Sequence, residues 1–244
     1  MIEVHQLAKR YADFEAVRGV SFSAGKGEIV GFLGPNGAGK TTTIRMLATY
    51  LPPTSGTAKV AGFDIASESD QVRKVLGYLP ENPPLYTEMT VAEYLTFVAK
   101  IKGVPTKMVP QRVERSLERC FLKDVRNKLC QHLSRGFRQR VGIAQAIIHD
   151  PQVIILDEPT SGLDPKQIIE IRQLIASLAE AHTVLISTHI LAEVSMVCTK
   201  VVIINQGRIV LENQLSALPE GRTLEQVFLE AVSSDDLHKI AVGG

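Results

Sequence analysis

The sequence predicts an α/β domain with a mostly parallel core sheet, and three observations support this fold class. Residues 34–41 fit the pattern G-x-x-x-x-G-K-[ST] of a phosphate-binding loop. Residues 153–156 and 183–186 are nearly apolar runs without alternation, as expected of strands buried on both faces of a parallel sheet. Segments with helical periodicity separate the strands, and strands that alternate with helices are typical of α/β domains.

The phosphate-binding loop reads Gly34-Pro35-Asn36-Gly37-Ala38-Gly39-Lys40-Thr41-Thr42. Its glycines allow a positive φ and a close approach of the backbone to a ligand, and its N–H groups can form a nest for anionic oxygens. Lys40 would bring a charge to the outer phosphates of a nucleotide, and the Thr41 hydroxyl suits Mg²⁺. Because a strand at residues 28–33 precedes the loop and a helix follows it, we favour nucleotide binding over an ordinary glycine-rich turn.

The N-terminal part of the chain carries short strand signals. Residues 2–4, 20–22 and 57–60 are predicted to form strands. Tyr11 lies ahead of the phosphate-binding loop, where an aromatic ring could stack on an adenine. From spacing alone, a half-exposed strand tyrosine is the favoured interpretation.

The middle of the chain changes to helical periodicity after a short helix at residues 71–76 and a strand at residues 77–81. Apolar residues then recur at helical spacing, as Val91, Leu95, Val98 and Ile101 and again as Val113, Leu117, Cys120 and Phe121. We expect an all-helical insert over residues 87–132, which the helical stretch of residues 137–149 extends to about residue 150. Two further crossover helices are the alternative.

The last part of the chain returns to the α/β pattern. Asp164 followed by Pro165 is typical of a helix start, and the helix that they begin carries Ile168, Ile171, Ile175 and Leu178 on one face. The predicted domain covers residues 1–232. Its remaining elements are a hairpin of residues 200–204 and 208–212 and a closing helix of residues 223–232, followed by a frayed tail of residues 233–244.

Polar side chains follow three strands at their predicted carboxyl ends, where ligands bind in such sheets. These residues are Glu81, Asp157, Glu158 and His189. Asp157 could hold Mg²⁺ together with Thr41, Glu158 could act as the general base for an attacking water, and His189 could hydrogen-bond to a γ-phosphate. A solvated loop for the carboxylates and a structural role for the histidine are the alternatives, which the strand context disfavours.

The composition excludes several classes of protein. The 244 residues carry 27 basic and 26 acidic side chains, a net charge of +1, so we expect no nucleic-acid partner. The three scattered cysteines contain no C-x-x-C pair, which argues against a zinc site or a disulfide framework. The N-terminus lacks a signal-peptide pattern, and the longest apolar runs are strand-sized, which predicts a chain without membrane spans.

Three further motifs carry a resemblance to a known family. Leu133-Ser134-Arg135-Gly136-Phe137-Arg138-Gln139-Arg140 resembles the ABC signature, whose consensus is L-S-G-G-Q. The run of residues 157–165 matches the Walker B and D-loop motifs, and Thr188-His189 matches the switch histidine. From about residue 2 to residue 232, the chain is thus similar to the ATP-binding subunit of an ABC transporter. That resemblance implies the P-loop NTPase fold of ABC ATPases, with a mostly parallel core sheet, an N-terminal antiparallel β subdomain and an all-helical insert. It also makes Tyr11 the adenine-stacking aromatic.

The resemblance also implies a homodimer in which two copies enclose two ATP molecules head to tail. Ser134 and Gly136 would contact the γ-phosphate held by the other copy's Lys40 and Thr41, and Asp164 of the D-loop would also lie at the nucleotide. A signature at a helix N-terminus suits this role, because the helix dipole and free N–H groups favour phosphate. Hydrolysis would combine the predicted base and histidine of one copy with the signature of the other.

The partners implied by the resemblance are integral-membrane permease subunits. The chain would be peripheral, on the cytoplasmic face of the inner or plasma membrane. Residues 82–92 and the helical insert would form the docking groove. Substrate specificity would then reside in the membrane subunits.

Two departures from the family pattern affect the expected site. Glu81 stands where glutamine is usual, and it keeps an oxygen acceptor for Mg²⁺ but loses the amide donor. Arg135 and Phe137 replace a glycine and a glutamine of the signature, and Arg135 could add a charge near the other copy's nucleotide or point to solvent. With residues 80–86 and 134–140, these departures are similar to exporter-type ATPases related to gliding-motility and sodium or multidrug efflux systems. The alternatives are a non-transport ABC ATPase of the cluster-assembly type and a regulatory ATP switch.

Overall fold

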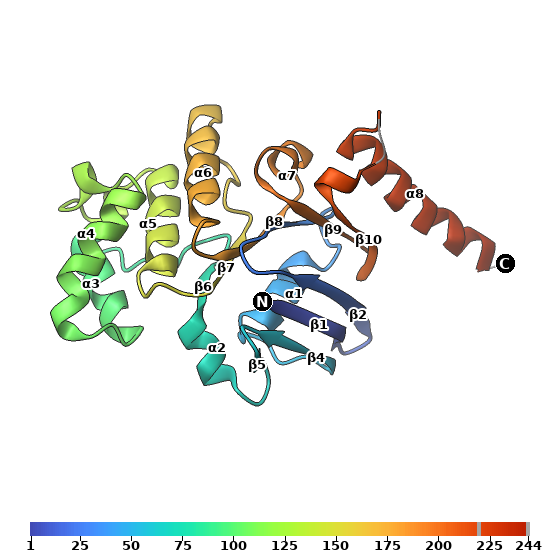
Figure 1. Cartoon of the computed structure of the whole chain (residues 1–244), viewed down its shortest axis with the longest axis horizontal. Helices are drawn as coiled ribbons and strands as arrows, with labels where there is room; N and C mark the ends of the chain where they lie inside the picture. Colours follow the sequence, from blue (N-terminus) through green and yellow to red (C-terminus); the bar gives the residue numbers. More distant parts are fainter. Residues whose placement is uncertain (219–220, 243–244) are drawn as a thin grey trace.

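The structure is a computed structural model that describes residues 1–218 and 221–242. It consists of two sheets, helices on both faces of the larger sheet, and a helical arm at one end (Figure 1). The strands are β1 (Ile2–Tyr11), β2 (Phe14–Ala24), β3 (Ile29–Leu33), β4 (Ser55–Val60), β5 (Phe63–Asp64), β6 (Leu76–Leu79), β7 (Val153–Asp157), β8 (Thr183–Thr188), β9 (Lys200–Asn205) and β10 (Arg208–Gln214). The α-helices are α1 (Lys40–Leu47), α2 (Ser69–Val75), α3 (Val91–Ile101), α4 (Val109–Arg119), α5 (Arg135–Ile147), α6 (Pro165–Leu178), α7 (Leu191–Val197) and α8 (Leu224–Val242).

The larger sheet has the strand order β10-β9-β3-β8-β7-β6. Neighbours from β9 to β6 are parallel, and β10 pairs antiparallel with β9. Every residue of β3, β7, β8 and β9 is buried, which confirms the prediction of strands covered on both faces. Because the strands are parallel, the residues that follow β3, β6, β7 and β8 meet at one edge of the sheet.

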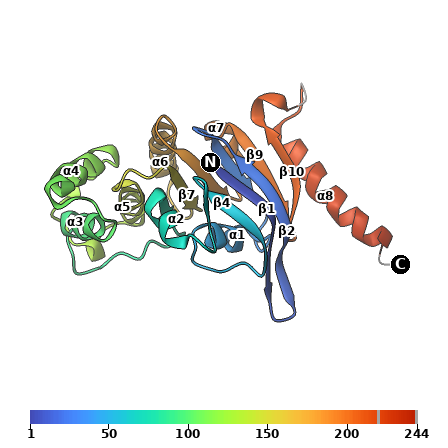
Figure 2. The ribbon, with the colours of Figure 1, turned by 60° about the horizontal axis from the view of Figure 1, so that its bottom comes forward.

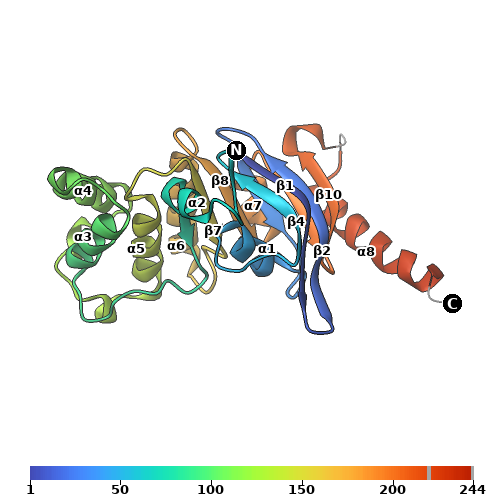
Figure 3. The ribbon, with the colours of Figure 1, turned by 90° about the horizontal axis from the view of Figure 1, so that it is seen from below.

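The smaller sheet is antiparallel, with the strand order β2-β1-β4-β5. Helix α1 packs between the two sheets, since it contacts β2 and β4 on one side and β7 and β8 on the other (Figure 3). The predicted strands of residues 2–4 and 20–22 are too short, because β1 and β2 continue into a long projecting hairpin (Figure 2). Register shifts between Val4 and Arg10 break the alternation of side chains there, so the sequence pattern fades before the strands end.

The helical arm lies between β6 and β7 in the chain. Helix α5 contacts both of those strands, whereas α3 and α4 pack against α5 and against each other at the far end of the molecule (Figures 1 and 3). Thr90 begins α3 with a capping box that includes Glu93. The three predicted helical stretches are therefore confirmed as helices, and their arrangement differs from that of simple crossover helices over a sheet.

Two elements near the C-terminus correct the sequence prediction. Helix α7 was not predicted, because seven residues are too few to show a helical period. Helix α8 begins at Leu224 as expected but runs to Val242, through most of the residues expected as a frayed tail. Residues 233–242 contain no glycine or proline that would end the helix, and the first glycine is Gly243. The last two residues of the predicted tail lie outside the described part of the chain.

Candidate active site

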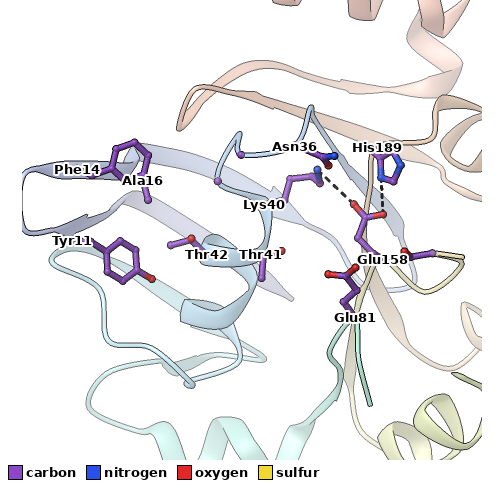
Figure 4. A pocket seen from close by; sticks show the side chains of 13 residues that line it. Tyr11, Phe14, Ala16, Asn36, Lys40, Thr41, Thr42, Glu81, Glu158 and His189 are labelled. Carbon is purple, nitrogen blue, oxygen red and sulfur yellow. Dashed lines mark hydrogen bonds and ion pairs between the residues drawn. The ribbon is translucent and has the colours of Figure 1, made fainter. Parts of the chain in front are cut away.

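A pocket of about 450 Å³ lies at the carboxyl edge of the larger sheet. It gathers residues from the β1–β2 hairpin, the phosphate-binding loop and the segments that follow β6, β7 and β8 (Figure 4). The lining residues are Tyr11, Phe14, Ala16, Asn36, Gly37, Gly39, Lys40, Thr41, Thr42, Glu81, Glu158, Ser161 and His189. Most of the side chains predicted for a nucleotide site are thus brought together by the fold.

The phosphate-binding loop links β3 to α1 and is shaped by its glycines. Gly37 and Gly39 have φ values of 79° and 107°, which other residues rarely adopt. Gly34 is required for a different reason, since a Cβ atom there would lie 2.3 Å from the carbonyl oxygen of Ile204. The N-cap of α1 is Gly39, which has no side chain to occupy the first N–H groups of the helix. These N–H groups and the helix dipole therefore favour an anion in the pocket.

The two loop glycines predict different losses of stability. Gly34→Ala should lower the free energy of unfolding by about 3 kcal/mol, because its methyl group meets a backbone atom that cannot rotate away. Gly37→Ala should cost about 1 kcal/mol, since a Cβ atom there meets nothing within 4 Å and only the positive φ is unfavourable. Guanidinium denaturation of both variants measures the difference. Equal losses would contradict the close packing of Gly34 against Ile204.

Lys40 is the cation of the loop and is buried. Its Nζ donates hydrogen bonds to the carbonyl oxygens of Gly34 at 2.8 Å and Pro35 at 3.2 Å. The same atom lies 3.6 Å from Oε1 of Glu158. The Lys40 ammonium group therefore lies between the phosphate-binding loop and the Glu158 carboxylate. Phosphate oxygens bound in the pocket would contact this ammonium group.

The side chains of Thr41, Asp157 and Glu81 bring oxygen atoms together where a hard cation could bind. The Thr41 hydroxyl donates to Oδ1 of Asp157 at 3.4 Å, Ser187 also donates to that oxygen, and Glu81 lines the pocket beside them. Burial raises the pKa of Asp157, and the nearby charge of Glu81 raises it further, although the bonds from Ser187 and Thr41 lower it. A carboxylate whose charge is disfavoured by its surroundings gains from a bound cation.

The donor set fits Mg²⁺. Among the side chains that the structure describes, in residues 1–218 and 221–233, no group of three or more His, Cys, Asp or Glu is placed to hold a metal ion. Mg²⁺ in nucleotide sites needs no such group, because one or two carboxylates, a hydroxyl, waters and the phosphates themselves complete its shell. Glu81 stands where the family usually has glutamine, and its carboxylate still supplies an acceptor oxygen for Mg²⁺.

Glu158 and His189 are in direct contact at the edge of the pocket. Oε2 of Glu158 lies 3.0 Å from Nδ1 of His189, and its other oxygen faces Lys40 (Figure 4). The backbone of Glu158 has a φ of 47°, a left-handed conformation held by bonds from its N–H to the carbonyl and hydroxyl oxygens of Ser187, both at 3.1 Å. The carboxylate is thus aimed into the pocket, where it can accept a proton from water, and the Nε2 side of His189 can meet a phosphate.

Two aromatic rings form the open end of the pocket. Tyr11 and Phe14 are opposite each other across the tip of the β1–β2 hairpin, and their exposed fractions are 44% and 61%. Exposed rings beside a phosphate site can stack on a base. Phe14 was missed by the sequence analysis, although its position three residues after Tyr11, across a tight turn, could have identified it.

Comparison with known proteins decides the family. The family model described as ABC transporter matches residues 17–161, more than half of the chain. The chain belongs to the ABC transporter ATP-binding family. It is therefore an ATP-binding and ATP-hydrolysing protein with the ABC ATPase fold, as the signature and Walker motifs predicted.

Relatives of known sequence and structure agree with this assignment. The chain is 37% identical over 233 residues to the ABC transporter ATP-binding protein NatA of Bacillus subtilis (strain 168), covering 93% of this chain and 95% of that protein. The structure of an ATP binding subunit of an ABC transporter has a TM-score of 0.86 at 30% identity, over 95% of this chain and 99% of that one. The dimeric structure of MJ0796, a bacterial ABC transporter cassette, has a TM-score of 0.80 at 25% identity, over 88% and 99% of the two chains.

The ABC signature lies outside the pocket of its own chain. Ser134 is the N-cap of α5 and accepts a bond from the N–H of Phe137 at 3.4 Å. Asp164 is the N-cap of α6 and accepts from the N–H of Gln167 at 3.0 Å. A Cβ atom at Gly136 would lie 2.6 Å from the Gln167 side chain, so the starts of α5 and α6 adjoin. Ser134, Gly136 and Asp164 therefore do not line the pocket of their own chain, and their predicted contacts with a nucleotide remain a prediction.

Arg135 connects the signature to the pocket. Its guanidinium donates to the Ser161 hydroxyl at 3.4 Å and covers Gly162, where a Cβ atom would lie 2.4 Å from Nη1. Ser161 is one of the residues that line the pocket. Arg135 is exposed, which agrees with the expected alternative of a side chain that points to solvent. It also contacts the D-loop of its own chain.

Proposed function

We propose that this ABC ATPase binds Mg²⁺-ATP in the pocket, pairs head to tail with a second copy, and powers a membrane transporter of the exporter type. The observation that carries the proposal is the separation of two half-sites. The pocket contains the phosphate-binding loop, the cation ligands and the Glu158–His189 pair, but the signature residues Ser134 and Gly136 lie outside it. A second copy of the chain could place its own signature residues at this pocket.

Each pocket residue has a defined role in the proposed reaction. Lys40 would bind the β- and γ-phosphates, and Mg²⁺ held through Thr41 and Asp157 would neutralise their charge. Glu158 would accept a proton from the attacking water as the new bond to the γ-phosphorus forms and the bond to ADP breaks. His189 would hydrogen-bond to the γ-phosphate, and the phosphate would leave as inorganic phosphate.

The proposed pairing is supported by geometry and by a relative. The starts of α5 and α6 adjoin, with Ser134 and Asp164 exposed and Gly136 buried against Gln167. Free N–H groups at a helix start favour phosphate. MJ0796, which shares the fold at 25% identity, forms a dimer. An ATP molecule enclosed between the pocket of one copy and this surface of another would have both sets of contacts.

A mixture of two inactive variants tests the pairing. Lys40→Ala removes the phosphate cation, and Ser134→Arg blocks the signature. Each variant alone should lose at least about 100-fold in kcat, whereas the mixture should recover part of it, because one of the two sites in a mixed pair contains neither change. A mixture with no recovered activity would reject the head-to-tail pair and leave the individual pocket roles intact.

A groove beside the helical arm is the proposed docking site for the permease. It has a volume of about 530 Å³ and includes Asn82 and Pro84 of the predicted docking segment together with Lys102, the C-cap of α3. Its other lining residues are Arg45, Ala48, Tyr50, Arg73, Leu76, Tyr78, Pro80 and Gln145. Among these described residues three are cations and none is a carboxylate, so the groove suits a partner segment of neutral or acidic character.

The membrane association is tested by purification. No helix within the described ranges is long and apolar enough to cross a membrane. We expect the chain, purified from detergent-solubilised native cells, to bring down a polytopic membrane protein in stoichiometric amount. A soluble partner alone would favour the cluster-assembly type of ABC ATPase, and absent turnover in a steady-state assay would favour the regulatory switch.

A further inference from the structure

Glu193 is a buried carboxylate that none of the sequence motifs includes. It lies on α7, four residues after His189, and its exposed fraction is only 5%. Charged side chains at such depth are costly unless they are paired or hydrogen-bonded. We therefore expect the Glu193 carboxylate to have specific hydrogen-bond partners.

Both oxygens of Glu193 accept bonds from buried threonine hydroxyls. Oε1 accepts from Oγ1 of Thr160, and Oε2 accepts from Oγ1 of Thr188 at 2.7 Å. The two threonines have exposed fractions of 3% and 1%. The Thr188 hydroxyl also accepts from the N–H of Ile190 at 3.0 Å, so its orientation is fixed by two bonds. Arg172 borders the same small cavity and supplies a positive charge nearby.

These threonines belong to the two segments that carry the hydrolytic residues. Thr160 follows Glu158 by two residues, and Thr188 directly precedes His189. We propose that Glu193 is a positioning residue for ATP hydrolysis, because its single carboxylate joins the segment after β7 to the end of β8 and so holds Glu158 opposite His189. The inference rests on the hydrolytic roles proposed above for those two residues.

The backbone of Glu158 explains why such a bridge is needed. Its left-handed φ of 47° is a conformation that a side chain with a Cβ adopts only when its surroundings hold it. Ser187 fixes the start of the segment by accepting from the Glu158 N–H, and Glu193 fixes the position two residues later. A loss of either anchor would let the carboxylate move away from His189, with which it is now in contact at 3.0 Å.

Glu193→Gln is the sharpest test, since glutamine has the same shape but only one acceptor oxygen. One hydroxyl then loses its acceptor, and we expect kcat to fall by about 10- to 100-fold with the KM for ATP within about 2-fold, because the phosphate contacts are untouched. Glu180→Gln, an exposed change two residues after the end of α6, is the matched control and should leave both constants unchanged. Thr160→Val should reproduce the loss, whereas Thr160→Ser, which keeps the hydroxyl, should restore activity.

A double variant separates positioning from a general loss of structure. If Glu193 acts through Glu158, then adding Glu193→Gln to Glu158→Gln should lower kcat by less than about 2-fold more, because the group that it positions is already gone. Equal losses in both backgrounds would overturn the inference, as would unchanged kcat in Glu193→Gln and Thr160→Val. Full activity of Glu158→Gln itself would instead reject the proposed base, which is a different result.

Discussion

Glu158→Gln should lower kcat for ATP hydrolysis by about 100- to 10,000-fold and leave ATP bound, which is the range of a lost general base. The glutamine keeps the size of the side chain, so the left-handed backbone and the bonds to Ser187 can remain. It loses the negative charge that faces Lys40 at 3.6 Å and His189 at 3.0 Å, and an amide cannot take a proton from water at neutral pH. A steady-state phosphate-release assay, with nucleotide binding measured separately, shows both effects.

Glu81→Gln is the matched control for that experiment, because it makes the same chemical change within the same pocket. Glutamine keeps an acceptor oxygen for Mg²⁺, so this variant should retain kcat within about 10-fold. If Glu81→Gln were as inactive as Glu158→Gln, the loss would reflect the charge of the pocket as a whole. Near-normal turnover of Glu158→Gln would remove this residue as the base.

Asp157→Asn should abolish Mg²⁺-dependent hydrolysis, by at least about 100-fold, and at the same time raise the melting temperature of the ligand-free protein. Burial raises the pKa of Asp157 above its ordinary value of 3.8, so the folded state holds the proton more tightly than the unfolded state does. The contribution of this group to stability is therefore present at low pH and is lost as the pH rises through the raised value. At pH 7 the ionised carboxylate carries this penalty and asparagine does not.

The pH dependence of the melting temperature tests whether ionised Asp157 destabilises the folded state. The asparagine variant should melt higher than the wild type at pH 7, by about 2–4 °C for each kcal/mol of relieved penalty. That difference should shrink toward zero when both proteins are measured below pH 3.8, where the carboxyl group is protonated in either state. Asparagine keeps an oxygen that can accept from Ser187 and Thr41. An equal or lower melting temperature at pH 7 would show that those two bonds outweigh the effect of burial.

The sequence was sufficient where function depends on residues that are adjacent in the chain. The phosphate-binding loop, the strand ending in Asp157-Glu158 and the N-cap of Asp164 all carry their own local signals, and the structure contains each of them. The carboxyl ends of parallel strands also meet at one edge by necessity. For this reason Glu81 and His189 could be assigned to the same pocket without any knowledge of distances.

The sequence was insufficient where a residue acts through partners far along the chain. Glu193 belongs to a helix of seven residues and depends on Thr160, a residue 33 positions away. The groove proposed for permease docking likewise combines Arg45 of α1 with Tyr78 of β6 and Gln145 of α5. Arg135 is a further example. The sequence offered two positions for its side chain, near the second nucleotide or in solvent, and neither included its contact with Ser161.

That contact of Arg135 has a consequence for cooperativity. In the proposed pair, the signature of each chain faces the nucleotide of the other, while Arg135 rests on the loop that follows the chain's own Glu158. A rearrangement of this loop when phosphate leaves one site would move the guanidinium, and with it the helix start offered to the opposite site. Each subunit would thus couple the state of its own nucleotide to the position of the signature that it offers to the opposite site.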